Sequence, residues 1–419
     1  MKILVLNCGS SSIKYQVMDM GAANPNAGAV NQNAQPTAEP ASPHLLGKGI
    51  VDRVGQSESE VVLKVEGRDN FVRELPIPDH KTGIALLIET ITDPQHGVIG
   101  SLDEIGAVGH RVAHGGSYFA DSALVTPDVV EKIRACFELA PLHNPANLQG
   151  ILSIDELLPG RPQVAVFDTA FHQTIPVENH TYALPHEIYE RYGVRKFGFH
   201  GTSHRFVAEK GARMAGLDLG NSRIITCHIG NGGSITAVLN GRSVDTSMGF
   251  TPVDGLVMGT RTGAIDPGAL LFIGEREGLS YKELGDLINK RSGVLGVSGL
   301  SSDMRDIVAA AEAGNERAVL ALAMYDARVK HFIGAYAALM GGVEMIIFTG
   351  GVGENQWQSR ARICSGLEYM GVDFDTAAND GLRGRDTIIS RPGSRVTVAV
   401  VTTDEELVIA QDTYRIVRR

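Results

Sequence analysis

The sequence predicts an α/β fold built from two domains, and three observations support this prediction. At 419 residues the chain exceeds the size at which a single hydrophobic core usually stops growing. Segments with the pattern of strands alternate with segments of helical periodicity, as in α/β proteins. A strand–glycine turn–strand unit also occurs once in each half of the chain, which indicates an internal duplication.

The bulk composition excludes several classes of protein. Hydrophobic residues make up 43% of the chain and charged residues 21%, as in ordinary globular proteins. The net charge of −10 argues against a general nucleic-acid binder. No apolar run approaches the roughly 20 residues of a membrane helix, and the N-terminal segment lacks the long apolar core of a signal peptide. The four cysteines are scattered without metal-ligand spacing, which is typical of reduced cytosolic thiols. We therefore expect a soluble, cytoplasmic protein that binds neither nucleic acid nor membranes.

The first predicted elements are two short strands around a turn. Residues 3–6 form a continuous apolar run and residues 13–17 show the alternation of a strand. The turn-prone segment 8–12 joins them. Residues 21–44 are rich in Ala, Asn and Pro and nearly uncharged, which predicts a surface loop rather than a partner-binding segment.

The second half of the chain repeats this pattern. Residues 224–229 and 234–239 are predicted strands joined by a glycine turn at 230–233, and Asn240-Gly241 predicts a hairpin into a third strand. Helical signals dominate residues 185–214 and 316–340, and the glycines at 341–342 are expected to end the second helix. A predicted strand at 345–349 follows, and then a glycine-rich loop at 350–355.

Three glycine-rich loops, at residues 8–12, 230–233 and 350–355, predict a nucleotide site. Glycine lets backbone N–H groups approach a phosphate without interference from a side chain. Neither the P-loop pattern nor the dinucleotide fingerprint occurs, which disfavours those two classes of site. The first two loops suit phosphates and the third suits an adenosine, an arrangement that resembles the superfamily of actin, sugar kinases and heat-shock chaperones. Asn7 stands where the first loop of that superfamily usually opens with Asp.

A series of motifs in order along the chain resembles the acetate kinase family. The likeness covers nearly the whole chain outside residues 21–44. Its motifs are NCGSSSIK at 7–14, GHRVAHGG at 109–116, FDTAFH at 167–172, GFHGTSH at 198–204, HIGNG at 228–232, MGTRTG at 258–263, SSDMR at 301–305, GGVGEN at 350–355 and TDEE at 403–406.

The resemblance implies both an architecture and an activity. Two actin-like domains are expected to enclose the active site in the cleft between them. The first domain is residues 1–170, with residues 406–419 packing back onto it, and the second is residues 171–405. The implied protein is a homodimer. It transfers the γ-phosphoryl group of ATP to acetate in a reversible, direct in-line reaction that gives acetyl phosphate and ADP.

The resemblance also assigns site residues. Asp168, His200, Arg261 and Arg111 match the catalytic positions. Asn7 and Glu405 match positions that hold Mg²⁺ through water, with Mn²⁺ as an alternative ion. The nucleotide is expected to contact Lys14, His228, Ile229, Gly230, Asn231, Gly232, Asp303, Met304, Arg305, Gly351, Val352, Gly353, Glu354 and Asn355.

This residue set suits a carboxylate acceptor. Phosphoryl transfer depends on positioning and charge neutralisation, and a carboxylate already carries its nucleophilic charge. No strong base is needed, but the repulsion between the acceptor carboxylate and the γ-phosphate must be offset. Arg111 and Arg261 are expected to offset it, and His200 is expected to donate a hydrogen bond to an equatorial oxygen of the transferring phosphoryl group. For Asp168 we favour a role in organising Mg²⁺ and water over a role as proton acceptor.

Each of these residues also has a purely structural interpretation. Asp168 follows an apolar strand, where a carboxylate often caps the next segment, and Glu405 lies at a predicted helix start. Arg111 and Arg261 have the alternative of pairing across domains, although their glycine-rich flanks favour ligand contact. The histidines at 110, 114, 143, 172 and 204 are interpreted as structural, as is the side chain of His228, and no HExxH-type pattern indicates zinc.

Two positions depart from the pattern of the family. The methyl pocket of acetate kinases resembles Ala113, Leu142, Phe199 and Pro252, and position 113 is usually Val there. Losing two methyl groups leaves room for one more methylene group, so propionate is an expected substrate and propionate kinase is the alternative function. Ala264 stands where the family often has Asp.

Two remoter alternatives are a sugar kinase, which would use a carboxylate base, and an actin-like or chaperone-like ATPase, which would need a partner-binding surface.

Overall fold

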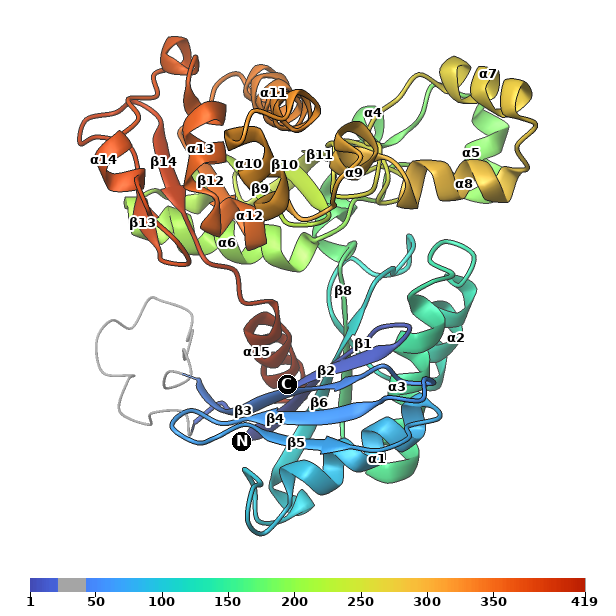
Figure 1. Cartoon of the computed structure of the whole chain (residues 1–419). Coiled ribbons are helices and arrows are strands. Elements are labelled where there is room, and N and C mark those ends of the chain that lie inside the picture. The colour runs from blue at the N-terminus through green and yellow to red at the C-terminus, as the bar shows by residue number, and fades with distance from the viewer. Residues whose placement is uncertain (22–42, 419) are drawn as a thin grey trace. The chain divides into compact units, whose positions relative to one another are not determined.

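The computed structural model describes residues 1–21 and 43–418. Residues 22–42 of the predicted loop at 21–44 lie outside the described residues, and His44 begins a strand. The chain divides into two compact units, one of Met1–Ala170 with Asp404–Arg419 and one of Phe171–Thr403. Each unit contains one β-sheet with helices packed against it (Figure 1), which confirms the α/β fold class.

The first unit is built on an eight-stranded sheet in the order β5-β4-β3-β2-β1-β6-β8-β7. Neighbouring strands from β1 to β5 are antiparallel, whereas β1, β6 and β8 run parallel to one another. The strands are β1 (Lys2–Cys8), β2 (Ser12–Asp19), β3 (His44–Asp52), β4 (Glu60–Lys64), β5 (Phe71–Glu74), β6 (Ile105–Val112), β7 (Ala123–Leu124) and β8 (Gln163–Phe167).

Helices cover both faces of this sheet. The helices are α1 (His80–Ile91), α2 (Pro127–Ala135), α3 (Asn144–Leu157) and α15 (Glu405–Val417). Leu4 of β1 packs in a cluster with Ile154 of α3, whereas its neighbour Ile3 packs with Ile409 of α15. Successive side chains of a strand point to opposite faces, so β1 is buried on both sides and residues 3–6 within it are apolar without interruption.

The second unit is built on a six-stranded sheet in the order β11-β10-β9-β12-β14-β13. The strands are β9 (Arg223–Ile229), β10 (Gly233–Leu239), β11 (Arg242–Thr246), β12 (Met345–Thr349), β13 (Thr387–Ile388) and β14 (Thr397–Val400). Its core repeats that of the first unit: β3-β2-β1-β6-β8 and β11-β10-β9-β12-β14 share both their order in the chain and their directions. Five matching strands support the internal duplication far better than the one matching turn visible in the sequence.

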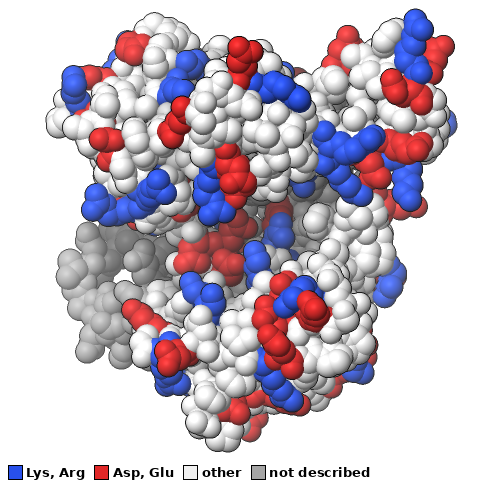
Figure 2. All heavy atoms as spheres, viewed as in Figure 1, with Lys and Arg blue, Asp and Glu red and all other residues white. Residues whose placement is uncertain are grey.

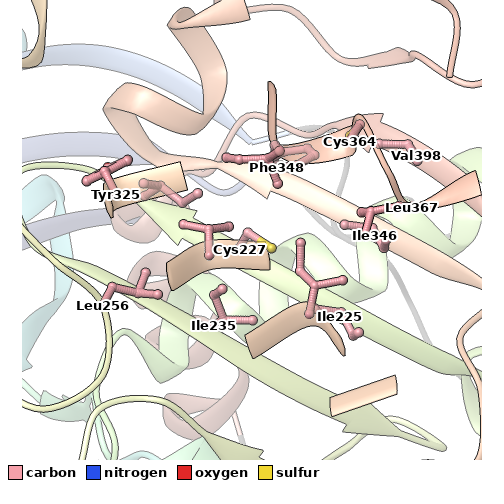
Figure 3. Close-up of a cluster of buried hydrophobic side chains, with 14 of the residues drawn as sticks. Ile225, Cys227, Ile235, Leu256, Tyr325, Ile346, Phe348, Cys364, Leu367 and Val398 are labelled. Atoms are coloured by element: carbon pink, nitrogen blue, oxygen red, sulfur yellow. The ribbon is translucent and has the colours of Figure 1, made fainter. Parts of the chain in front are cut away.

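The helices of the second unit also pack on both faces of its sheet. They are α4 (Val177–His180), α5 (His186–Tyr192), α6 (Gly201–Ala215), α7 (Pro267–Glu277), α8 (Tyr281–Lys290), α9 (Gly293–Ser298), α10 (Met304–Glu312), α11 (Glu316–Leu339), α12 (Gly350–Asn355), α13 (Trp357–Cys364) and α14 (Thr376–Asn379). Helix α6 covers one face. On the other face α11 packs over the main core, where Tyr325 of the helix joins strand residues such as Cys227 and Phe348 (Figure 3). Acidic and basic side chains are interspersed over the surface of this unit in Figure 2.

Most of the predicted elements are present with small shifts of their ends. The strands predicted at 3–6, 13–17, 224–229, 234–239 and 345–349 lie within β1, β2, β9, β10 and β12. Asn240 and Gly241 have φ values of 51° and 77°, as a type I′ hairpin turn requires, and Leu239 pairs with Arg242 across it. Helix α11 ends at Leu339, and Gly341 follows with a φ of 70°. Within the described ranges no helix combines the length and the apolar character of a membrane span.

The helical signals at 185–214 are confirmed by two helices, α5 and α6, between which the chain turns through left-handed conformations at Gly193, Gly198 and His200. One prediction of local structure was wrong. The glycine-rich loop predicted at 350–355 is the short helix α12. Glycine disfavours helix, so contacts with the rest of the unit must supply the stability that local propensity lacks.

Candidate active site

Three polar side chains of the first unit meet where neighbouring parallel strands end. Asn7 lies at the end of β1, Arg111 near the end of β6, and Asp168 directly after β8. Arg111 Nε donates to Asp168 Oδ1 at 3.0 Å, and Arg111 Nη2 donates to Asp168 Oδ2 at 2.5 Å. Arg111 Nη1 also donates to Asn7 Oδ1 at 3.2 Å. The carboxyl ends of parallel strands are the usual place for ligands in α/β sheets, and here they hold one guanidinium in a fixed orientation.

Charge is concentrated around this guanidinium. Asp168 is only 2% exposed, and its carboxylate raises the pKa of Arg111, which therefore stays cationic. Burial raises the pKa of Glu405 to about 7; Arg111 opposes this rise, whereas the carboxylates of Asp168 and Glu406 add to it. Lys14 on β2 pairs with Asn7 across the strand ladder, so an ammonium group belongs to the same edge of the sheet. The cluster thus carries several formal charges of both signs.

The oxygen atoms of the cluster suit Mg²⁺ by their chemistry. Mg²⁺ prefers carboxylate and amide oxygens and keeps several of its own waters, so one or two side chains suffice to position it. Asn7 and Glu405 offer such oxygens, although Asn7 Oδ1 already accepts a hydrogen bond from Arg111. Across residues 1–21 and 43–418, no group of three or more His, Cys, Asp and Glu side chains is arranged to hold a metal ion. A water-mediated Mg²⁺ site at Asn7 and Glu405 therefore stays a prediction.

A network of histidines in the second unit orients His200. His200 adopts a left-handed conformation (φ 57°) immediately before α6. Its Nδ1 lies 2.9 Å from Ser234 Oγ, and the same hydroxyl lies 2.7 Å from His204 Nε2. The ring of His200 stacks on that of His228 at a centroid distance of 4.3 Å. Burial holds the pKa of His204 well below its usual value, so this part of the network is neutral.

A pocket of about 550 Å³ lies in the second unit, a volume within the range of small-ligand sites. It lies among α9, α10, α11, α12 and the ends of β9 and β12. Its lining residues are Gly230, Asn231, Gly259, Val294, Ser302, Asp303, Met304, Arg305, Tyr325, Gly351, Val352, Asn355, Gln356 and Arg383. Gly259 is needed for the close approach here, because a Cβ at this position would lie 1.7 Å from Asn231 Oδ1.

Arg261 lies against the glycine turn that borders this pocket. Its Nη1 is 3.1 Å from the position that a Cβ on Gly232 would occupy, so the absence of a side chain at Gly232 admits the guanidinium. Arg261 Nη1 also donates to the carbonyl of Pro252 at 3.4 Å. Burial lowers the pKa of Arg261, and no carboxylate contributes to that shift. A desolvated guanidinium at a glycine turn is suited to a phosphate oxygen.

A buried arginine, Arg360, stabilises segments next to the residues that line the pocket. Arg360 on α13 is fully buried and donates to three oxygens at 2.8 Å: Asn379 Oδ1, the carbonyl of Gly353 in α12, and the carbonyl of Leu382. Burial lowers the pKa of Arg360 to about 10, so the group is still charged near neutral pH. The guanidinium thereby ties α12 to the segment that carries Arg383, the next residue after Leu382.

Comparison with known proteins identifies the family of this arrangement. The model of the acetokinase family matches residues 2–411. The chain belongs to the acetokinase family. An acetate kinase of Parabacteroides distasonis is 51% identical over 416 residues, which cover 99% of each chain. An acetate kinase of Heliobacterium modesticaldum is 52% identical over 418 residues, which cover 100% of each chain.

Two solved structures are similar to this chain over nearly its whole length. The crystal structure of Porphyromonas gingivalis acetate kinase is 49% identical and superimposes with a TM-score of 0.92, covering 99% of each chain. A propionate kinase from Francisella tularensis is 39% identical, with a TM-score of 0.86 and the same coverage.

The pocket contains eight of the residues that the resemblance to this family assigned to the nucleotide. These are Gly230, Asn231, Asp303, Met304, Arg305, Gly351, Val352 and Asn355. Six expected residues do not line it: Lys14, His228, Ile229, Gly232, Gly353 and Glu354. Glu354 instead accepts hydrogen bonds from the backbone N–H groups of Gly350 and Thr403, which stabilise α12. The carbonyl of Gly353 accepts a hydrogen bond from Arg360.

The sequence analysis missed six lining residues: Gly259, Val294, Ser302, Tyr325, Gln356 and Arg383. Gly259 and Ser302 belong to motifs that carry the resemblance, and Gln356 directly follows another such motif. These motifs could therefore have indicated all three residues as part of the nucleotide site. Tyr325 occupies an ordinary core position of a long helix, and nothing in its local sequence distinguishes it.

The residues predicted for the methyl pocket differ in their exposure. Ala113 is buried beside Arg111 in the chain, and its N–H donates to Asn147 Oδ1 at 3.0 Å. Leu142, also of the first unit, is 71% exposed. Phe199 is buried and Pro252 is partly buried in the second unit. A shared contact of these four side chains with one substrate stays a prediction.

Proposed function

We propose that this chain is an acetate kinase, which transfers the γ-phosphoryl group of ATP to acetate and returns ADP and acetyl phosphate. The full-length similarity to proteins named acetate kinase supports this activity. The observation that carries the proposal is the guanidinium of Arg111, which Asp168 and Asn7 fix at the carboxyl ends of three strands. Such a group suits a small carboxylate better than a neutral sugar hydroxyl.

The proposed reaction moves one group and no proton. An acetate oxygen forms a bond to the γ-phosphorus, and the bond from that phosphorus to the β–γ bridging oxygen breaks, with ADP as the leaving group. The acceptor is already an anion, so Asp168 has no proton to remove. Asp168 holds Arg111 in place, and its role in organising Mg²⁺ and water stays a prediction. Arg111 and Arg261 offset the repulsion between the two anions.

We assign His200 the role of hydrogen-bond donor to the transferring phosphoryl group. Ser234 engages the Nδ1 edge of its ring, so we assign the Nε2 edge to the phosphoryl oxygen. A donor placed before the reaction begins needs no reorganisation in the transition state. Mg²⁺, held through water at Asn7 and Glu405, would supply charge neutralisation for the phosphates when bound, and Mn²⁺ would serve in its place.

Propionate kinase is the second candidate because of one position. Ala113 is buried and smaller than the Val that the family usually carries there. A single methylene group in an apolar pocket changes selectivity by only about 1–3 kcal/mol, so activity with propionate is expected alongside acetate. The propionate kinase among the similar structures is consistent with this second activity.

The decisive assay measures acyl phosphate formation. The protein is incubated with ATP, Mg²⁺ and acetate or propionate, the acyl phosphate is trapped as its hydroxamate, and the two kcat/KM values are compared. A larger value for acetate supports the proposal, and a larger value for propionate favours the second candidate. Absence of product from both acids would overturn the proposal.

We further infer a cytoplasmic homodimer. All four cysteines are buried and unpaired, as expected in a reducing compartment. On α11 the apolar side chains of Val319, Leu320, Met324 and Leu339 are exposed, which supports a contact with a second copy of the chain. Light scattering of the native protein and of Met324→Glu tests this, because the charged variant is expected to shift the mass toward that of one chain.

A further inference from the structure

The nucleotide pocket contains a polar group without a partner. Tyr325 on α11 is 2% exposed and lines the pocket of about 550 Å³. Among the described residues no group forms a hydrogen bond with its hydroxyl. A buried hydroxyl without a partner costs roughly 1–3 kcal/mol, and phenylalanine would fill the same space without that cost. Tyr325 thus contributes to the wall of the cavity and has a buried hydroxyl without a partner among the described residues, and a ligand in the cavity would supply that partner.

The surroundings of Tyr325 indicate which part of a nucleotide it faces. Val294 of α9 and Met304 of α10 line the same pocket and belong to the same apolar cluster as Tyr325. Gly230 and Gly351 line the pocket at the ends of the strands, and Arg261 lies beside the adjoining glycine turn. The pocket thus has an apolar wall and a glycine-rich wall. The planar base suits the first, and the anionic phosphates suit the second.

We propose that Tyr325 recognises the base of the bound nucleotide. The Tyr325 hydroxyl hydrogen-bonds to the edge of the base, and the face of the base packs against Val294 and Met304. The inference rests on the proposed use of ATP and adds a specificity-determining residue to it. A phenol hydroxyl both donates and accepts, so it can pair with a ring nitrogen or with an exocyclic amine. Nucleotide binding would then satisfy a group that the ligand-free protein leaves without a partner.

The same helix supplies a matched control. Tyr336 of α11 is 3% exposed, and its hydroxyl also finds no partner among the described residues. Tyr336 does not line the nucleotide pocket. Tyr325→Phe and Tyr336→Phe therefore remove the same group from equally buried positions on one helix, and only the first removes it from the pocket.

The experiment is titration calorimetry of ADP into the native protein and the two variants, with steady-state kinetics in parallel. Tyr325→Phe is expected to weaken ADP binding about 3- to 10-fold, the value of one uncharged hydrogen bond. It should raise the KM for ATP similarly and leave the KM for acetate unchanged. Tyr336→Phe should change none of these. In the absence of nucleotide, both variants should unfold at the native temperature or above it, because each loses an unsatisfied buried group.

Three outcomes would overturn the inference. The first is native ADP affinity in Tyr325→Phe, and the second is equal weakening in both variants. The third comes from repeating the titration with 2′-deoxyADP: a loss that disappears with this ligand would assign the hydroxyl to the ribose instead of the base. A failure of the proposed function is separately visible, because the native protein would then bind ADP without forming acetyl phosphate.

Discussion

Replacing Asp168 by Asn tests the arginine-centred cluster most directly. The variant keeps the size of the side chain and removes its charge. Asp168 accepts hydrogen bonds from Arg111 through both carboxylate oxygens, and an amide offers one oxygen and turns an NH₂ group toward a cationic donor. Removing one partner of a buried ion pair costs about 3–5 kcal/mol. The Arg111 side chain is 26% exposed, so solvent screening reduces the expected loss to about 2–3 kcal/mol.

This loss should appear in both stability and rate. For a unit of this size it corresponds to a decrease of roughly 5–10 °C in the unfolding temperature. A misoriented Arg111 guanidinium that raises the activation free energy by a similar amount lowers kcat about 100-fold. Differential scanning calorimetry and the hydroxamate assay measure the two effects.

A matched control separates this effect from the general loss of a carboxylate. Asp128→Asn breaks the exposed pair with Lys132 one helical turn away, and an exposed pair of this kind contributes only a few tenths of a kcal/mol. Asp128→Asn is expected to leave stability and activity unchanged. Native stability and native kcat in Asp168→Asn would refute the reasoning.

Three further predictions concern selectivity, pH and the support of the nucleotide pocket. Ala113→Val should lower kcat/KM for propionate about 10- to 100-fold relative to that for acetate, because the added methyl groups occupy the space of one methylene. The combined contribution of His110, His114 and His172 to the free energy of unfolding should be constant above pH 6.5 and fall as the pH drops toward 4, since burial lowers their pKa values to about 4. The unfolded chain takes up these protons first, so each histidine contributes a slope of up to about 1.4 kcal/mol per pH unit, measurable by urea unfolding. Glu405, with its pKa raised to about 7, offsets the slope of one of the three histidines between about pH 7 and 4.5. Arg360→Met should cost at least about 3 kcal/mol in urea unfolding and weaken ADP binding, because three buried oxygens lose their donor.

Clear results would contradict each of these three predictions. An unchanged ratio of propionate to acetate activity would show that position 113 does not limit the methyl pocket. Equal urea midpoints at pH 7 and pH 5 would show that the three histidines are protonated in the folded protein. A variant at position 360 with native stability and native ADP affinity would show that the buried guanidinium is dispensable.

The sequence predicted the strands and the residues at their ends well, for physical reasons. Strands buried on both faces contain continuous apolar runs, as at residues 3–6 of β1 and 345–348 of β12, and a hairpin with two positive φ values needs a pair such as Asn240-Gly241. The polar residue that closes such a strand lies at the edge of the sheet, so Asn7 and Asp168 could be identified from their position after apolar segments.

The remaining features depend on contacts between distant segments. Helix α12 forms from a glycine-rich hexapeptide because Glu354 and the donor from Arg360 hold its backbone, and no local pattern encodes that support. Arg360 itself occurs in a sequence that would suit an exposed helix. For Tyr325, the informative property is the absence of a partner for its hydroxyl among the described residues, which only the folded unit reveals.

The burial of Arg360 has a consequence for behaviour in salt. Dissolved ions screen exposed charges over a Debye length of about 8 Å at physiological ionic strength, but they do not enter a protein interior. Arg305 and Arg383 at the pocket are exposed, so added salt should weaken their attraction for a nucleotide. The Arg360 guanidinium is fully buried, so its field at the pocket is screened much less than that of Arg305 and Arg383. Although the chain has a net charge of −10, it thus keeps part of its attraction for a nucleotide at ionic strengths that screen its exposed charges.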